Sequence, residues 1–147
     1  MYGYNKVDGL TGITEFLDES ERNAAYWLAN LPDDKIPYWD FNADLSQALP
    51  WGPQKDSSAA AIAASGLLDL TEQTSVPEHA MAYHNAALVM LDVLAQPPYL
   101  ASDTPGWEGI LKHGVYHTKK NLGVDESVMW GDFFFVEALT KVVGRLA

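Results

Sequence analysis

One stretch of the chain constrains the fold most: residues 56–70 read DSSAAAIAASGLLDL. Almost all of these side chains are small or apolar, so a helix formed here would have no wide polar face. A helix that is apolar all round is buried inside a larger body, and small side chains let neighbouring helices approach closely. Asp56, Ser57 and Ser58 are favourable N-cap residues, because their side-chain oxygens can accept the first unpaired backbone N–H groups. We therefore expect a buried helix that begins near Asp56.

The other helical patterns alternate between surface and buried character. Residues 14–31 and 76–95 carry apolar side chains at helical spacing together with many polar ones, which is typical of surface helices. We expect Thr14 to cap the first of them and Ser75 to cap the second, in a capping box with Glu78. Residues 132–146 open with Asp132, a candidate N-cap, followed by FFFV, and are apolar on most sides. This predicts a second buried helix. The apolar stripe of the second surface helix is expected to contain Met81, His84, Leu88, Leu91 and Ala95.

The stretches between these helices show no helical period. We expect residues 1–13 to be a connection, and residues 32–55 and 97–129 to be two long irregular loops. Loops of this length are uncommon in compact domains unless they are functional or disordered, and the aromatic residues Tyr38, Trp39 and Trp51 argue against disorder. If successive helices run antiparallel, both loops lie at the same end, and each leads into a buried helix. That aromatic face is the expected binding site.

Composition excludes several classes of function. The net charge of −11 argues against nucleic acid or an anionic membrane as a partner, and no apolar run reaches the length of a membrane span. The chain has no cysteine and its N-terminus does not resemble a signal peptide, which together favour a cytoplasmic location. His113 and His117 offer only two imidazoles with no third ligand in the pattern, whereas zinc normally takes three or four protein ligands. We expect no metal and no cofactor.

Four blocks of the sequence carry a resemblance to a known family. They are residues 37–41 (PYWDF), 55–67 (KDSSAAAIAASGL), 113–117 (HGVYH) and 130–139 (WGDFFFVEAL). In this order they resemble the C-terminal part of the unsaturated glucuronyl hydrolases, glycoside hydrolase family 88. The resemblance implies an all-α fold, the C-terminal portion of an (α/α)6 toroid in which outer and inner helices alternate. Residues 1–147 would then be the C-terminal part of a single domain whose N-terminal half is absent.

The resemblance also implies an activity. Members of this family release terminal unsaturated uronic acid from oligosaccharides made by polysaccharide lyases, and an aspartate acts as general acid and base in hydrating the C4–C5 double bond. That aspartate is expected upstream of the matched blocks, so this chain holds no catalytic residue, is inactive alone, and needs the N-terminal half of the same enzyme as its partner. Two alternatives stay open: a non-catalytic helical or sugar-binding fragment, and the related unsaturated rhamnogalacturonyl hydrolases.

Six residues are candidates for substrate binding, and most of them also have a purely structural interpretation. Asp56 is most simply an N-cap, and the tryptophans could be loop anchors that bury a large area. Tyr116 resembles a family tyrosine near the uronate site and lies among the basic residues of the second loop. A phenol and an imidazole can both donate hydrogen bonds to a carboxylate. The candidates are Trp39, Asp56, Ser57, Tyr116, His117 and Trp130.

Overall fold

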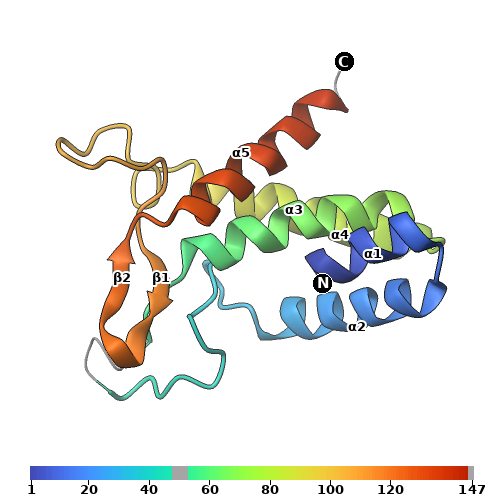
Figure 1. The fold of residues 1–147 in the computed structure, drawn as a ribbon, viewed down its shortest axis with the longest axis horizontal. Coiled ribbons are helices and arrows are strands. Elements are labelled where there is room, and N and C mark those ends of the chain that lie inside the picture. The colour runs from blue at the N-terminus through green and yellow to red at the C-terminus, as the bar shows by residue number, and fades with distance from the viewer. Residues whose placement is uncertain (48–52, 146–147) are drawn as a thin grey trace.

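The protein is mostly helical, as expected, with one small antiparallel sheet (Figure 1). The structure is a computed structural model that describes residues 1–47 and 53–145. Within the described residues, none of the helices is long and apolar enough to cross a membrane. The elements in chain order are α1 (Tyr2–Thr11), α2 (Thr14–Asn30), α3 (Ser57–Gln73), α4 (Pro77–Leu94), β1 (Gly114–His117), the 3-10 turn η1 (Thr118–Lys120), β2 (Leu122–Glu126) and α5 (Met129–Gly144).

Helix α3 lies at the centre and packs against α1 on one side, α5 on the other and α4 along its length (Figure 1). Successive helices from α2 to α5 run antiparallel, so α3 and α5 point the same way. The segment between α2 and α3 and the β1–β2 hairpin both lie at the end where α3 and α5 begin. The structure therefore confirms that the two long connections meet at one end.

The expected buried helix is confirmed in α3. Its small and apolar side chains are nearly all buried, and Asp56 is its N-cap, whose side chain accepts hydrogen bonds from the backbone of Ser58 and Ala59. Gly66 shows why small residues are needed here: a Cβ atom at this position would come within 3.2 Å of the backbone of Tyr2 in α1. The sequence of α3 thus permits the close helix contacts that bury it.

Helix α5 only partly matches its expectation. It is as apolar as predicted, but only Gly131, Phe135 and Ala138 are buried. One side packs on α3, while the opposite side carries exposed apolar side chains such as Phe133 and Val136. The prediction of a second fully buried helix is wrong for this chain, because no neighbouring helix covers that side within the described residues.

Four expectations for the helices need correction. Residues 1–13 are not an irregular connection: they include α1, which packs on α2 and α3. Ile13 and Val76 occupy the N-cap positions of α2 and α4, so Thr14 and Ser75 do not cap them. Met81 is 62% exposed and Leu88 is 36% exposed, whereas Leu91 of the expected stripe is buried. The stripe that α4 buries contains Tyr83, Ala87, Met90, Leu91 and Leu94, because these residues face α3 and the core around it.

The second long loop is not irregular throughout. Its C-terminal part forms the β1–β2 hairpin, with the backbones of Val115 and Val124 paired and a register irregularity next to Gly114. Gly114 packs tightly, since a Cβ atom here would lie 2.7 Å from the Val128 side chain. The hairpin thus sits directly against the start of α5.

Candidate functional site

The start of α3 is organised by the Asp56 carboxylate. Its Oδ1 atom accepts hydrogen bonds from the Ser58 backbone N–H at 3.0 Å, the Ser58 hydroxyl at 2.6 Å and the Ala59 N–H at 3.3 Å. It also accepts the backbone N–H of Val115 in β1, at 3.3 Å. Burial raises the pKa of Asp56, although these hydrogen bonds act in the opposite direction. Asp56 therefore caps α3 and ties the hairpin to it.

The start of α5 is held close to the same point. The Trp130 indole N–H donates to the Ser58 hydroxyl at 3.1 Å. Gly131 allows this approach, since a Cβ atom there would lie 3.0 Å from the Ser58 Cβ. The Ser58 hydroxyl thus links Asp56 to Trp130, and it joins the first turns of two parallel helices.

An aromatic surface continues from Trp130 to the hairpin. The Tyr116 ring lies 5.7 Å from the Trp130 ring and 6.4 Å from the His117 ring, in edge-to-face arrangements. Tyr116 is 60% exposed, so its phenol group is open to solvent beside the two helix starts. Lys119 and Lys120 are exposed in the turn that joins the two strands. The end of the molecule where α3 and α5 begin therefore combines an exposed phenol, an imidazole and an indole.

The connection between α2 and α3 reaches the same end. The Trp39 backbone N–H donates to the Gln54 carbonyl at 2.8 Å, and the Asp56 N–H donates to the Pro37 carbonyl at 3.0 Å. The Lys55 ammonium lies 4.1 Å from the centre of the Tyr38 ring. The backbone of Trp39, which is half-buried, is therefore tied to Gln54, two residues before the α3 cap. Trp51, the other tryptophan expected in this loop, lies outside the described residues.

The structure brings most of the candidate residues together but gives them different surroundings. Tyr116 and Trp130 form the aromatic surface, and His117 adjoins Tyr116. Ser57, by contrast, is 1% exposed, and its backbone N–H donates to the His113 carbonyl at 3.0 Å. The structural interpretation of Asp56 as a cap is confirmed, whereas a substrate contact by any of the six candidates stays a prediction.

Sequence reasoning missed two links at this end. Ser58 was recognised only as a possible cap, whereas its hydroxyl joins Asp56 to Trp130. Asp132 does not cap α5, because it lies within the first turn and Val128 holds the cap position. Its carboxylate instead accepts the backbone N–H groups of Ile110 and Leu111, both at 2.9 Å. The spacing of 22 residues between Asp132 and Ile110 gives no local signal of this contact.

His113, the first histidine of the second loop, contacts a carboxylate of the hairpin. His113 adopts a positive φ of 65° and pairs through Nδ1 with the Asp125 carboxylate across the hairpin. Asp125 is thus a hydrogen-bond partner of His113 within the hairpin. Across residues 1–47 and 53–145, no group of three or more His, Asp or Glu side chains is placed to hold a metal ion.

A second polar cluster lies further along α3 and α5, away from the aromatic surface. The Ser65 hydroxyl donates to Glu137, and the Lys141 ammonium donates to the Ser65 hydroxyl at 2.8 Å and pairs with Asp69 at 2.8 Å. The Tyr2 phenol of α1 donates to Glu137 at 3.0 Å. Burial would raise the pKa of Glu137, but the hydrogen bonds from Ser65 and Tyr2 and the charge of Lys141 lower it overall.

The contacts between α3 and α5 share one register. The Ser58–Trp130 and Ser65–Glu137 hydrogen bonds both join residues 72 positions apart. Because this difference in residue number is the same two helical turns apart, α3 and α5 lie side by side and run in the same direction over this length. The polar cluster at one end therefore helps to fix Trp130 over Ser58 at the other end.

Comparison with known proteins places this arrangement in a family. The assignment comes from individual relatives, because no family model matches the chain. It is 32% identical over 146 residues to an unsaturated glucuronyl hydrolase of Bacillus sp. (strain GL1), covering 97% of this chain and 37% of the relative. It is 34% identical over 143 residues to an unsaturated glucuronyl hydrolase of Formosa agariphila, covering 96% of this chain and 34% of the relative. An unsaturated chondroitin disaccharide hydrolase of Streptococcus pneumoniae is 37% identical over 121 residues, which cover 79% of this chain and 28% of the relative.

Solved structures agree with the sequence relatives. The crystal structure of the Bacillus sp. GL1 unsaturated glucuronyl hydrolase superposes with a TM-score of 0.83, covering 96% of this chain and 36% of that one. An unsaturated glucuronyl hydrolase specific for heparin superposes with a TM-score of 0.86 at 33% identity, covering 99% of this chain and 38% of that one. The fold is thus part of an (α/α)6 toroid of the glycosidase type. The chain belongs to the unsaturated glucuronyl hydrolase family, and it spans about a third of the length of the curated relatives it matches.

Proposed function

We propose that this chain is part of a glycoside hydrolase that releases terminal unsaturated uronic acid from lyase-generated oligosaccharides by hydrating the C4–C5 double bond. The activities for which the relatives are named support this proposal, since both glucuronyl and chondroitin disaccharide hydrolases are among them. A Streptococcus agalactiae relative, 28% identical, has been solved in complex with the unsaturated disaccharide dGlcA-GalNAc6S. The cysteine-free composition supports a cytoplasmic location as a further part of the proposal.

The observation that carries the proposal is the meeting of the family-type blocks at one end of the helices. Residues from four separate stretches of the sequence form this end: Trp39, the α3 cap, the hairpin and the start of α5. We propose that this end is one wall of the sugar pocket, and that the acid–base aspartate belongs to the part of the enzyme outside this chain. Asp56 is committed to four hydrogen bonds and acts in the proposal as a positioning residue.

The aromatic surface has the chemistry to receive the uronate group. The Tyr116 hydroxyl and the His117 imidazole can donate hydrogen bonds to a carboxylate, and Trp130 offers an apolar ring for a sugar face. Helix α5 begins without a side-chain cap, so its first N–H groups and the positive end of its dipole face the same region. The first N–H groups of α3 differ, because Asp56 already accepts from them.

The test compares the chain alone with the intact enzyme that contains it. On an unsaturated disaccharide, the chain alone should leave the ultraviolet absorbance of the C4–C5 double bond unchanged, because the general acid is supplied from elsewhere. In the intact enzyme, Tyr116→Phe should raise KM by roughly tenfold or more, equivalent to about 1.4 kcal/mol of lost binding. Lys120→Ala, in the exposed turn of the hairpin, is the matched control and should change KM little.

Two results would count against this assignment. Hydrolysis by the purified chain alone would place a catalytic acid within it, and unchanged kinetics for both Tyr116→Phe and His117→Ala would remove the hairpin from the site. Sugar binding by the intact protein without any loss of double-bond absorbance would instead support the alternative of a non-catalytic sugar-binding module.

A further inference from the structure

The connection between α2 and α3 folds back on itself as a short ribbon just before α3 begins. Residues 37–39 pair with residues 54–56, and the backbones of Tyr38 and Lys55 form an antiparallel bridge at its centre. Side chains alternate between the two faces of such a ribbon, and bridge partners share a face. Tyr38 and Lys55 therefore lie on one face of the ribbon, and Trp39 and Asp56 belong to the other.

The ammonium group of Lys55 is the centre of the contacts on its face. It donates to the Asp34 carboxylate and to the Ile36 carbonyl, both at 2.8 Å, and it lies 4.1 Å from the centre of the Tyr38 ring. An ammonium group has three N–H donors, and these three contacts account for them. The Lys55 side chain is only 23% exposed. Lys55 therefore acts within the protein and not on a bound sugar.

The contacts of Lys55 all reach one turn of the chain. The Asp34 carboxylate that receives the ammonium also accepts the Ile36 backbone N–H at 3.3 Å. Between them, Lys35 has a positive φ of 64°, a conformation that is costly for a residue other than glycine. The turn therefore depends on the contacts that surround it, and it leads directly into the segment that carries Trp39.

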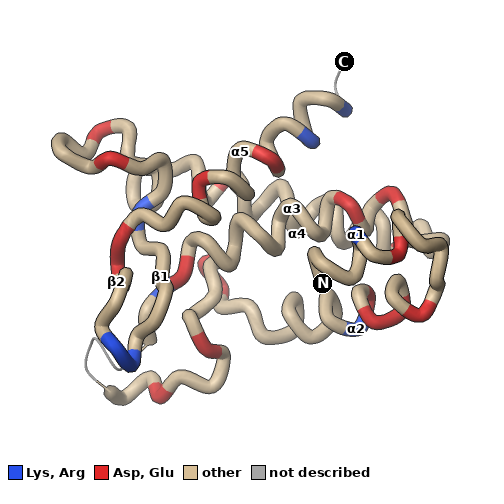
Figure 2. The backbone as a smooth tube through the Cα atoms, in the orientation of Figure 1, with Lys and Arg blue, Asp and Glu red and all other residues tan. Residues whose placement is uncertain are grey.

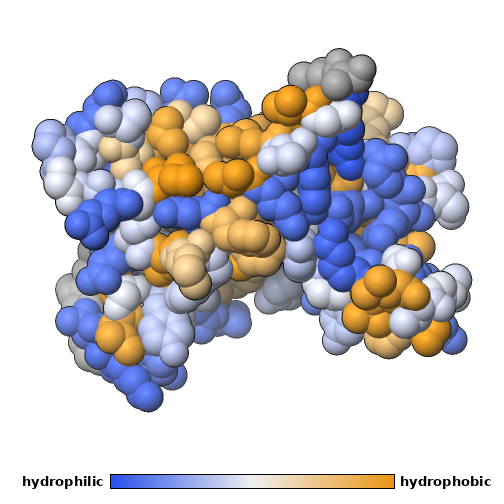
Figure 3. All heavy atoms as spheres, turned by 45° about the horizontal axis from the view of Figure 1, so that its top comes forward, coloured by the Kyte–Doolittle hydropathy of each residue, from blue (hydrophilic) through white to orange (hydrophobic). Residues whose placement is uncertain are grey.

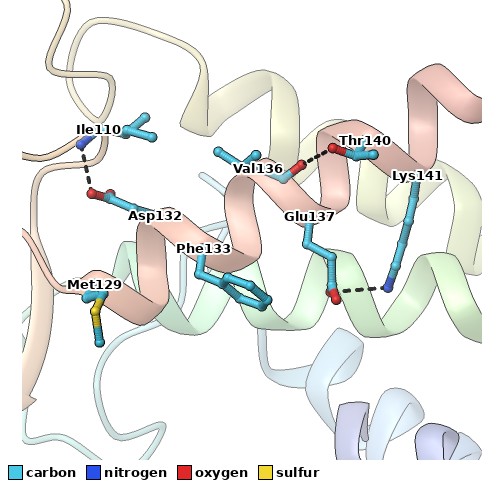
Figure 4. A pocket seen from close by; sticks show the side chains of 8 residues that line it. All are labelled: Ile110, Met129, Asp132, Phe133, Val136, Glu137, Thr140 and Lys141. Atoms are coloured by element: carbon cyan, nitrogen blue, oxygen red, sulfur yellow. Dashed lines mark hydrogen bonds and ion pairs between the residues drawn. The ribbon is translucent and has the colours of Figure 1, made fainter.

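A second lysine of the molecule is held in a similar way. Lys141 of α5 is 19% exposed and pairs with the Glu137 carboxylate at 3.3 Å (Figure 4). It donates to the Ser65 carbonyl at 3.2 Å, and its ammonium lies 5.4 Å from the centre of the Tyr2 ring. Figure 2 shows acidic residues along several of the elements, so a carboxylate partner alone is not distinctive. What distinguishes Lys55 is its place in the molecule.

Lys55 lies between two parts of the candidate site. It directly precedes Asp56, whose carboxylate accepts the Val115 backbone N–H at 3.3 Å and so holds the strand that carries Tyr116. Through the turn and the ribbon, Lys55 also holds the segment that carries Trp39. Movement of the ribbon would therefore change the position of Trp39 relative to Tyr116.

We propose that Lys55 is a positioning residue, whose ammonium group holds the ribbon so that Trp39 keeps its place in the wall of the sugar pocket. The inference rests on the proposed function in taking this end of the molecule as that wall. Because Lys55 acts on the wall and not on the reacting double bond, its loss should weaken substrate binding and leave the chemical step nearly unchanged.

The test incorporates fluorotryptophan into the intact enzyme and follows the fluorine NMR resonance of Trp39, which is assigned by its loss in Trp39→Phe. Lys55→Met removes the ammonium group and keeps most of the stem, and it should shift or broaden this resonance. On an unsaturated disaccharide it should raise KM roughly threefold or more and keep kcat within about twofold of the wild type. Lys55→Arg keeps the charge and can stack on the Tyr38 ring, so it should restore both properties.

Two further variants separate positioning from a general loss of stability. Lys141→Met removes the same three kinds of contact from α5 and should lower the thermal stability without moving the Trp39 resonance. Asp34→Asn weakens the Lys55 contact at a side chain that is 50% exposed, and it should shift the Trp39 resonance in the same direction by less. Combined with Lys55→Met, it should add no further shift, because both changes act on one contact.

Three results would overturn the inference: an unchanged Trp39 resonance in Lys55→Met, a shifted resonance with an unchanged KM, or an equal shift in Lys141→Met. The proposed function fails differently. An intact wild-type enzyme that hydrolyses no unsaturated disaccharide would contradict the proposed activity, and the fluorine resonance alone would then decide whether Lys55 holds Trp39 in place.

Discussion

Helices α3 and α5 are similarly apolar in composition but have different surroundings. Both are rich in apolar side chains, and the same argument from composition predicts that both are buried. Helix α3 has α1, α4 and α5 around it and buries most of its length, whereas α5 has α3 on one side and an open apolar face on the other. We infer that the apolar composition of a helix indicates its burial in the complete toroid. The open face of α5, over which hydrophobic side chains gather in Figure 3, is then the place where the described residues provide no neighbouring helix.

The largest effect that can sharpen this comparison comes from matched leucine truncations. Leu67 of α3 is 0% exposed and Leu139 of α5 is 37% exposed. Leu67→Ala should lower the free energy of unfolding by about 2–5 kcal/mol, because it leaves a cavity in a packed core. Leu139→Ala should lower it by less than about 1 kcal/mol in the chain alone. Urea unfolding at low protein concentration measures both, and equal losses would mean that α5 is packed as tightly as α3.

The acidic residues near the two helix starts give the next largest difference. Asp56→Ala removes the cap of α3 and the hydrogen bond to Val115, and we expect a loss of about 2 kcal/mol. Asp132→Ala removes two bonds from a loop and should cost about 1 kcal/mol. Asp56→Asn keeps an accepting oxygen and should recover most of the stability. A variant Asp132→Ala as unstable as Asp56→Ala would show that α5 also depends on its first-turn carboxylate.

The smallest effect concerns pH and the polar cluster that joins α1, α3 and α5. Although burial acts to raise it, the pKa of Glu137 lies below its ordinary value of 4.5, since the hydrogen bonds from Ser65 and Tyr2 and the charge of Lys141 outweigh burial. A carboxyl group with a lowered pKa in the folded state stabilises the fold above its unfolded pKa, and this contribution is lost as the pH falls through the folded pKa. Stability should therefore fall below about pH 4.5.

The Glu137→Gln variant tests this dependence. It should be less stable than the wild type at neutral pH and should lose less stability on acidification, as measured by thermal unfolding across the acidic range. Glu126→Gln, at an exposed position of β2, is the matched control and should keep the wild-type pH dependence. An unchanged acid response in Glu137→Gln would show that the cluster does not couple the three helices.

Much of the fold follows from local sequence signals. The buried helix, its cap at Asp56, the surface helix α2 and the meeting of both long connections at one end are all confirmed. These features depend on periodicity and on capping within a few residues, which a single sequence contains. The four quoted blocks were also sufficient to indicate the family that the comparisons show.

What the sequence could not predict depends on distant contacts. Helix α1 has little periodic pattern of its own; its Asn5 is buried because the side chain donates to the Gly66 carbonyl of α3 at 2.7 Å. The hairpin depends on an irregular register at Gly114 and on the link from Val115 to Asp56. Among the site residues, the bridging role of Ser58 requires α5 to lie beside α3, and no local pattern contains that information.

The central claim, that α5 is an inner helix lacking one neighbour, is tested most directly by amide hydrogen–deuterium exchange on the chain alone and on the intact enzyme. In the chain alone, the amides of α3 should exchange slowly and those of α5 much faster, because local stability follows burial. In the intact enzyme, protection should rise strongly in α5 and at the outer edge of α1 and should change little in α3. Protection of α5 that equals that of α3 in the chain alone, or that does not rise in the intact enzyme, would contradict the account.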